Sequence, residues 1–96
     1  MDAVSKKEVL SMSRKAHDLT ESWYQKNPSQ RGDSGWAEKQ RILLADLALH
    51  LLQTALNEGE LSEENLKRNL FSILTISDQI VHGYGLKALA DELFST

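Results

Sequence analysis

A leucine-rich segment in the middle of the chain constrains the fold more than any other feature. Residues 36–57 are predicted to form a helix whose apolar side chains cover most of its circumference: Ile42, Leu43, Leu44, Ala45, Leu47, Ala48, Leu49, Leu51, Leu52, Ala55 and Leu56. Its polar strip is narrow and consists of Asp46, His50, Gln53 and Asn57. A helix that is apolar nearly all round is normally buried on several sides. Because a chain this short has few helices to surround it, we expect part of this surface to meet a second copy or another protein.

The segment before it is predicted to form a long first helix. Ser5 and Glu8 have the spacing of a capping box, and the helix should run to about Lys26, before Pro28. One stripe of this helix is apolar and is expected to face inward: Val9, Met12, Ala16, Leu19 and Trp23. Residues 27–35 collect Gly, Pro, Ser, Asn and Asp, which predicts the longest loop of the chain.

Two further helices follow the leucine-rich segment. Gly59 has the position of a helix-ending residue, and Ser62 is the expected N-cap of a third helix. Gly83 and Gly85 should break that helix, which leaves a short fourth helix from about Leu86. Short connections favour antiparallel neighbours. The sequence therefore predicts an all-α fold, a small antiparallel helical bundle of three long helices plus a short C-terminal helix.

Composition places the chain among ordinary globular domains. The 96 residues are 41% hydrophobic and 26% charged and contain no cysteine, so we expect one helical domain, residues 1–96, stabilised by packing alone. Residues 1–10 lack the apolar core of a secretory signal. The apolar run at residues 42–52 is interrupted by charge and is too short to cross a bilayer. We expect a cytoplasmic protein with no membrane partner.

Charge is distributed unevenly along the chain. Residues 1–48 hold eight Lys or Arg and seven Asp or Glu, whereas residues 49–96 hold three and seven. The basic residues of the first helix are interleaved with acidic ones and form no stripe that could neutralise phosphates. Direct binding of nucleic acid is therefore not expected.

Three pairs of potential metal ligands stand four residues apart: His17 with Glu21, Asp46 with His50, and Asp78 with His82. This spacing places both members of a pair on one helix face, but it also arises on solvated faces. We therefore predict neither a metal nor another cofactor. For Asp46 and His50 two interpretations stay open, a buried pair that needs hydrogen-bonding partners or a strip that faces water, and we favour the second.

No catalytic constellation is visible in the sequence. There is no cysteine, no serine lies in a Gly-x-Ser-x-Gly elbow, and the Gly-Tyr-Gly at residues 83–85 lacks a nucleotide fingerprint. We therefore do not expect an enzyme and name no catalytic residue.

Aromatic and arginine residues gather near the long loop and suggest a contact surface, because both types are enriched in binding hot spots. The predicted partner-binding residues are Tyr24, Arg31, Trp36 and Arg41, together with Leu49 and Leu52 of the leucine-rich helix. In the alternative interpretation Trp23 and Trp36 close the end of the core. Tyr24, which lies off the Trp23 stripe, is expected to be the more exposed of the two neighbours.

Residues 42–79 read ILLADLALHLLQTALNEGELSEENLKRNLFSILTISDQ. This order of a leucine-rich helix, a Gly turn and a second amphipathic helix ending near Ser-Asp resembles the paired helices of small enteric biofilm and acid-resistance regulators. The resemblance implies a dimeric regulator. It covers less than half of the chain and leaves out the first helix and the loop around Pro28.

These observations favour a non-enzymatic protein–protein interaction module, a small bacterial or phage regulator, adaptor or inhibitor that binds a protein partner and forms a homodimer. A first alternative is an immunity protein, whose acidic second half would face a basic toxin or bacteriocin; it rests on analogy of fold. A second alternative is a metal-dependent helical-bundle enzyme.

Overall fold

The computed structural model describes residues 1–95 and is all-helical, which confirms the predicted fold class. Three long helices, α1 (Ala3–Lys26), α2 (Trp36–Leu56) and α3 (Glu63–Ile80), are followed by the short α4 (Leu86–Glu92). The bounds agree closely with those expected from caps, glycines and Pro28. Local signals therefore placed the helices along the chain, apart from the start of α1.

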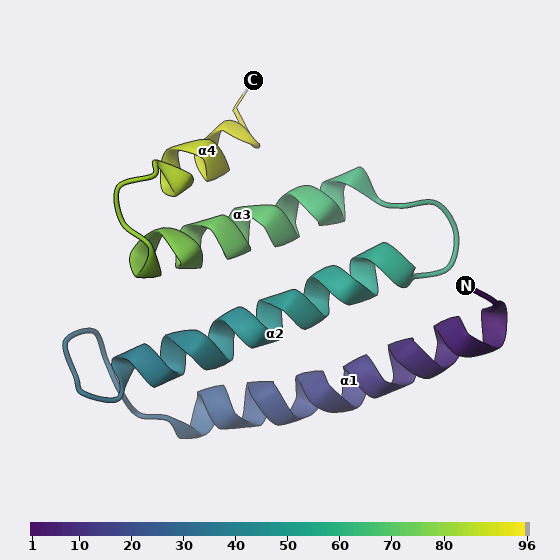
Figure 1. Ribbon diagram of the computed structural model, residues 1–96, viewed down its shortest axis with the longest axis horizontal. Helices are drawn as coiled ribbons and strands as arrows, with labels where there is room; N and C mark the ends of the chain where they lie inside the picture. The colour runs from purple at the N-terminus through teal and green to yellow at the C-terminus, as the bar shows by residue number, and fades with distance from the viewer. Residues whose placement is uncertain (96) are drawn as a thin grey trace.

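The helices lie side by side in one layer, with α2 in the middle (Figure 1). α2 contacts α1 on one side and α3 on the other, α3 contacts α4, and α1 makes no contact with α3. The molecule measures 44 × 37 × 17 Å. Since an α-helix with its side chains is about 10–12 Å across, the shortest dimension leaves room for a single layer. This bundle is open, and both of its broad faces are uncovered.

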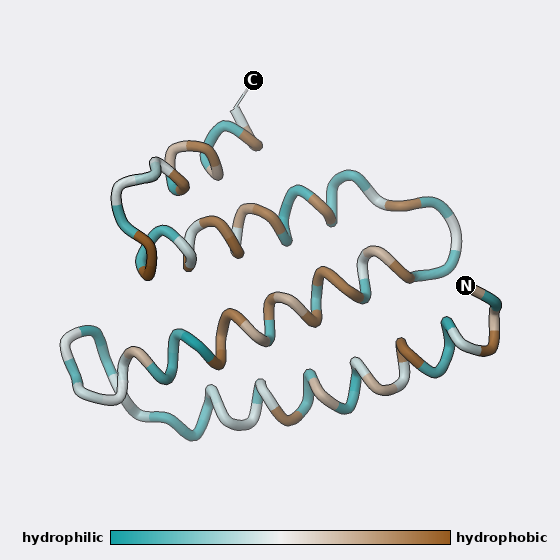
Figure 2. Tube along the Cα trace, in the orientation of Figure 1, coloured by the Kyte–Doolittle hydropathy of each residue, from teal (hydrophilic) through white to brown (hydrophobic). Residues whose placement is uncertain are grey.

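The open layer buries little of its apolar surface. Among the described residues, the apolar side chains that are buried belong to Leu10 and Ala90, and none is in α2. Figure 2 shows the apolar run along α2, which has neighbours at two edges and nothing above or below. The radius of gyration is 15.1 Å, compared with about 12.5 Å for a compact domain of this length. The leucine-rich helix is therefore not enclosed by its own chain.

The prediction for the inner face of α1 is wrong. The expected apolar stripe lies outside, with Met12, Leu19 and Trp23 exposed by 60%, 59% and 59%. The side of α1 that meets α2 is a more polar stripe, also spaced by threes and fours: Leu10, Ser13, His17, Thr20 and Tyr24. The polar strip of α2 accounts for this orientation of α1, because Asp46 and His50 require polar partners.

α1 begins three residues earlier than its predicted capping box. Asp2, and not Ser5, is the N-cap, and its Oδ1 accepts a hydrogen bond of 2.8 Å from the Ser5 amide. This bond, supported by the Ser5 hydroxyl, lowers the pKa of the Asp2 carboxyl below its ordinary value of 3.8. An aspartate cap is strong because its charge also favours the positive end of the helix.

The first turn of α1 is expected to fray in acid. Because the pKa of Asp2 is depressed by folding, its contribution is present above the ordinary pKa of 3.8 and is lost as the pH falls through the lower value. Amide hydrogen exchange of residues 4–6 as a function of pH measures this. Asp2→Asn keeps an acceptor that does not titrate and should remove the pH dependence; equal acid fraying in both proteins would refute the assignment.

α3 begins at the predicted cap. The Ser62 hydroxyl accepts a hydrogen bond of 3.2 Å from the Asn65 amide, and Glu63 and Glu64 lie in the first turn. Both arrangements stabilise the positive end of the helix.

Ser62→Ala is expected to lower the free energy of unfolding by about 1 kcal/mol, because one orphan amide of α3 loses its acceptor. A urea unfolding curve followed by circular dichroism measures the change. Ser62→Asp, which retains the acceptor, should unfold close to the parent protein; a loss equal to that of the alanine variant would contradict the capping role.

α4 folds back onto α3 after a glycine turn. Gly85 has φ = 68°, a left-handed conformation that glycine adopts readily, and directly precedes α4. The rings of Phe71 and Phe94 meet edge to face at 5.5 Å, and Lys87 Nζ lies 4.4 Å from the centre of the Phe71 ring. Ala90 is fully buried. An aromatic contact and one buried alanine therefore hold α4 against α3.

Within residues 1–95, no helix combines the length and the apolar character that crossing a membrane demands.

Candidate functional site

Two hollows lie along the line where α1 and α2 meet. One end is lined by Val9, Met12, Ser13, Ala16, Leu49 and Leu52. The other end is lined by Thr20, Trp23, Glu38, Arg41, Ile42 and Ala45. The α2 members of both sets share one side of that helix, since they recur at spacings of three and four. We call these two hollows together the α1–α2 groove.

The groove has the chemical character of a contact surface. Met12 and Trp23 are each more than half exposed. At the Trp23 end, Arg41 and Glu38 form an ion pair of 3.3 Å, so that the rim carries both signs of charge. Large apolar and aromatic side chains beside an arginine are typical of binding hot spots.

The structure brings three of the six predicted contact residues together. Arg41, Leu49 and Leu52 line the α1–α2 groove. Trp36 lines a separate hollow between α2 and α3, which shares Arg41 with the groove. Arg31 is exposed in the loop and lies apart from both.

The expected exposure of the two neighbouring aromatic residues is reversed. Trp23 is 59% exposed, whereas Tyr24 is only partly exposed and faces α2, with Lys39 Nζ 4.7 Å from its ring centre. The sequence prediction missed Met12 and Trp23 as contact residues because it assigned their stripe to the core. The apolar stripe could be recognised in the sequence, but the sequence did not show that it faces outward.

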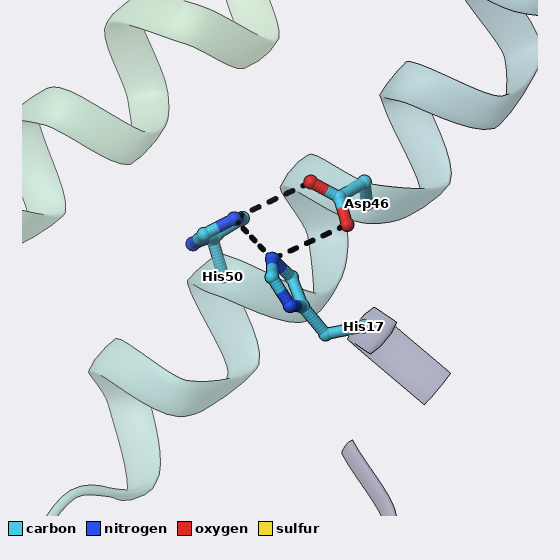
Figure 3. Close-up of side chains that lie close together, drawn as sticks. All are labelled: His17, Asp46 and His50. Carbon is cyan, nitrogen blue, oxygen red and sulfur yellow. Dashed lines mark hydrogen bonds and ion pairs between the residues drawn. The ribbon is translucent and has the colours of Figure 1, made fainter. Parts of the chain in front are cut away.

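A polar cluster lies between α1 and α2 (Figure 3). His17 Nε2 lies 2.9 Å from His50 Nε2 and 3.4 Å from Asp46 Oδ1, and His50 Nε2 lies 3.3 Å from Asp46 Oδ2. The two rings meet edge on, with their centres 4.5 Å apart. We call these three residues the histidine–aspartate cluster. It joins the Asp46–His50 pair recognised in the sequence to a histidine 33 residues away.

The expectation that this strip simply faces water is wrong for Asp46. Its side chain is 13% exposed, that of His17 is 21% exposed and that of His50 is 45% exposed. The Thr20 hydroxyl donates a 2.6 Å hydrogen bond to Asp46 Oδ1, which fixes the carboxylate in place. On the far side of the His17 ring, Glu21 Oε2 lies 3.6 Å from Nδ1. The cluster thus brings the ligand atoms of two imidazoles and one carboxylate within 4.8 Å of one another.

No known protein family, curated protein or solved structure matches the chain. The resemblance of residues 42–79 to the small enteric regulators stays a prediction, and the function is argued from the geometry of this molecule.

Proposed function

We propose that the protein is a non-enzymatic interaction module that works as a homodimer, in which the α1–α2 groove of one copy packs against that of a second. The observation that carries the proposal is the large surface left exposed by the single layer of helices. A domain core requires at least two layers of secondary structure, and a second copy would supply the missing one.

The exposed area is large enough for a stable interface. The chain exposes 6831 Å², whereas a folded monomer of its mass is expected to expose about 5,500 Å². The excess of about 1,300 Å² exceeds the roughly 800 Å² that each partner contributes to a standard interface. Covering one face would therefore restore the exposure of an ordinary compact domain.

Symmetry and charge favour a second copy as the occupant. A two-fold interface places the same patch on both sides, so the patch must be complementary to itself. The groove satisfies this condition because its walls are apolar and the charges at its rim, Glu38 and Arg41, are already paired. A patch of one charge would repel its own copy.

Such a dimer suits a small regulator, adaptor or inhibitor, the class favoured by the sequence. Pairing through the groove leaves the opposite side of α2 free. There Leu43 and Leu47 form a second apolar hollow with Phe71 and Ile76 of α3. A further protein partner could bind this side while the dimer holds together.

Single cysteines test which surface forms the interface, since the chain contains none of its own. Met12→Cys, Ala45→Cys and Leu52→Cys each place one thiol in the groove. At a two-fold axis, equivalent thiols approach each other, and at least one variant should form an intermolecular disulfide under mild oxidation. Leu61→Cys, at a residue 53% exposed outside the groove, is the control. If no groove variant cross-links faster than the control, the proposal fails.

A further inference from the structure

We propose that His17, Asp46 and His50 form a binding site for a divalent transition metal, of which Zn²⁺ is the best match. The proposal goes beyond dimerisation and does not depend on it. Among the described residues, these three bring their ligand atoms within 4.8 Å of one another.

The spacing of the atoms fits tetrahedral coordination. With Zn–N and Zn–O bonds of about 2.0–2.2 Å, two ligand atoms of a tetrahedral site are about 3.3 Å apart. The two Nε2 atoms are 2.9 Å apart, and each lies near a different oxygen of Asp46: His17 Nε2 is 3.4 Å from Oδ1 and His50 Nε2 is 3.3 Å from Oδ2. Since one ligand atom of each residue lies within 4.8 Å of the other two, small rotations of the side chains would bring all three around a single ion.

The donor set also selects a metal of this class. Imidazole nitrogen and carboxylate oxygen together suit Zn²⁺ and its neighbours in the transition series better than Ca²⁺ or Mg²⁺, which prefer oxygen alone. The two Nε2 atoms face each other and both face a carboxylate, an arrangement that a cation among them would satisfy. A direct N–H···N hydrogen bond between the two rings is the competing arrangement.

Neighbouring side chains hold the ligands in position before a metal arrives. The Thr20 hydroxyl donates a hydrogen bond to Asp46 Oδ1, which orients the carboxylate. Glu21 Oε2 lies 3.6 Å from His17 Nδ1 and favours the tautomer with the proton on Nδ1, which leaves the lone pair of Nε2 free for the metal. Pairs of this kind are a regular feature of zinc sites.

The site would clamp α1 to α2. The seam between these helices is polar at this point, where His17 and Thr20 of α1 meet Asp46 of α2. A metal bound by one ligand from α1 and two from α2 would link the two helices here, because binding energy at such a site becomes folding energy. The partial exposure of His50 leaves the fourth position open to water.

The three ligands lie outside the α1–α2 groove, although Thr20, which orients Asp46, also lines it. On α2, Asp46 and His50 lie about 110° around the helix from the middle of the groove residues. Substitutions of the ligands should therefore leave self-association unchanged, so that failure of one proposal does not imply failure of the other.

Calorimetric titration of the metal-free, intact protein with ZnCl₂ tests the proposal, together with the unfolding midpoint at each metal concentration. We expect one Zn²⁺ per chain and a midpoint that rises with zinc. His17→Gln and His50→Gln should each abolish this binding, whereas His82→Gln, which alters an exposed histidine outside the cluster, should bind as the parent does. Thr20→Val keeps all three ligands and should weaken binding by about 10- to 100-fold.

Three results would overturn the proposal. The first is the absence of saturable binding and of any midpoint shift, which would leave a hydrogen bond between the two rings as the sole role of the pair. The second is binding that survives removal of both His17 and His50. The third is half an ion per chain, which would place the site between two copies. Circular dichroism of the metal-free variants establishes that they are folded, and the Thr20→Val result stands even if a ligand variant unfolds.

Discussion

Met12→Asp is expected to make the protein monomeric while leaving its helices intact. Met12 is 60% exposed in the single chain and lines the α1–α2 groove, so a carboxylate there is solvated in the monomer and buried without a partner in the dimer. We expect the dimer to weaken by at least about 2 kcal/mol, roughly a factor of 30 in its dissociation constant. Sedimentation equilibrium over a dilution series measures the change.

The matched control for this prediction is Leu61→Asp. Leu61 is 53% exposed and lies in the α2–α3 connection, outside the groove, so the same change of charge should leave the dissociation constant unaltered. Leu49→Asp and Leu52→Asp, from the other wall of the groove, should weaken association as Met12→Asp does. Equal behaviour of Met12→Asp and Leu61→Asp would show that the groove is not the interface.

Ala90→Leu should cause a large loss of stability, because Ala90 is fully buried where α4 meets α3. Leucine adds three carbon atoms to a site with no free space, and such overpacking typically costs about 1–3 kcal/mol. The urea midpoint should fall, and the edge-to-face contact between Phe71 and Phe94 should be disturbed, which the chemical shifts of their ring protons report.

Ala88→Leu provides the comparison on the same helix. Ala88 is exposed, and leucine is a good helix former, so the variant should unfold within about 0.5 kcal/mol of the parent. If Ala90→Leu were equally harmless, the α3–α4 contact would be looser than the geometry indicates.

The positions of the helices could be predicted because the signals that set them are local. Pro28 ends the first helix region, Ser62 supplies an acceptor for amides three residues ahead, and Gly85 permits the turn before α4. Each effect depends on neighbouring residues alone. The start of α1 was misplaced because Asp2 and Ser5 both can cap a helix, and the sequence does not decide between them.

The way the helices face each other could not be predicted, because it depends on contacts between distant residues. α1 has an apolar stripe and a polar stripe, and apolar burial alone favours turning the stripe of Met12 and Trp23 inward. The polar strip of α2 reverses that choice, since Asp46 finds Thr20 and His17 on the other side of α1. For the same reason the histidine–aspartate cluster could not be predicted, because His17 is 29 residues before Asp46 in the sequence.

The central claim is that one layer of helices is incomplete without a second copy, and the molar mass of the intact protein in solution tests it most directly. Light scattering at micromolar concentrations should give twice the chain mass of 10.8 kDa, falling toward the chain mass on dilution. A mass of 10.8 kDa at every concentration would contradict the account.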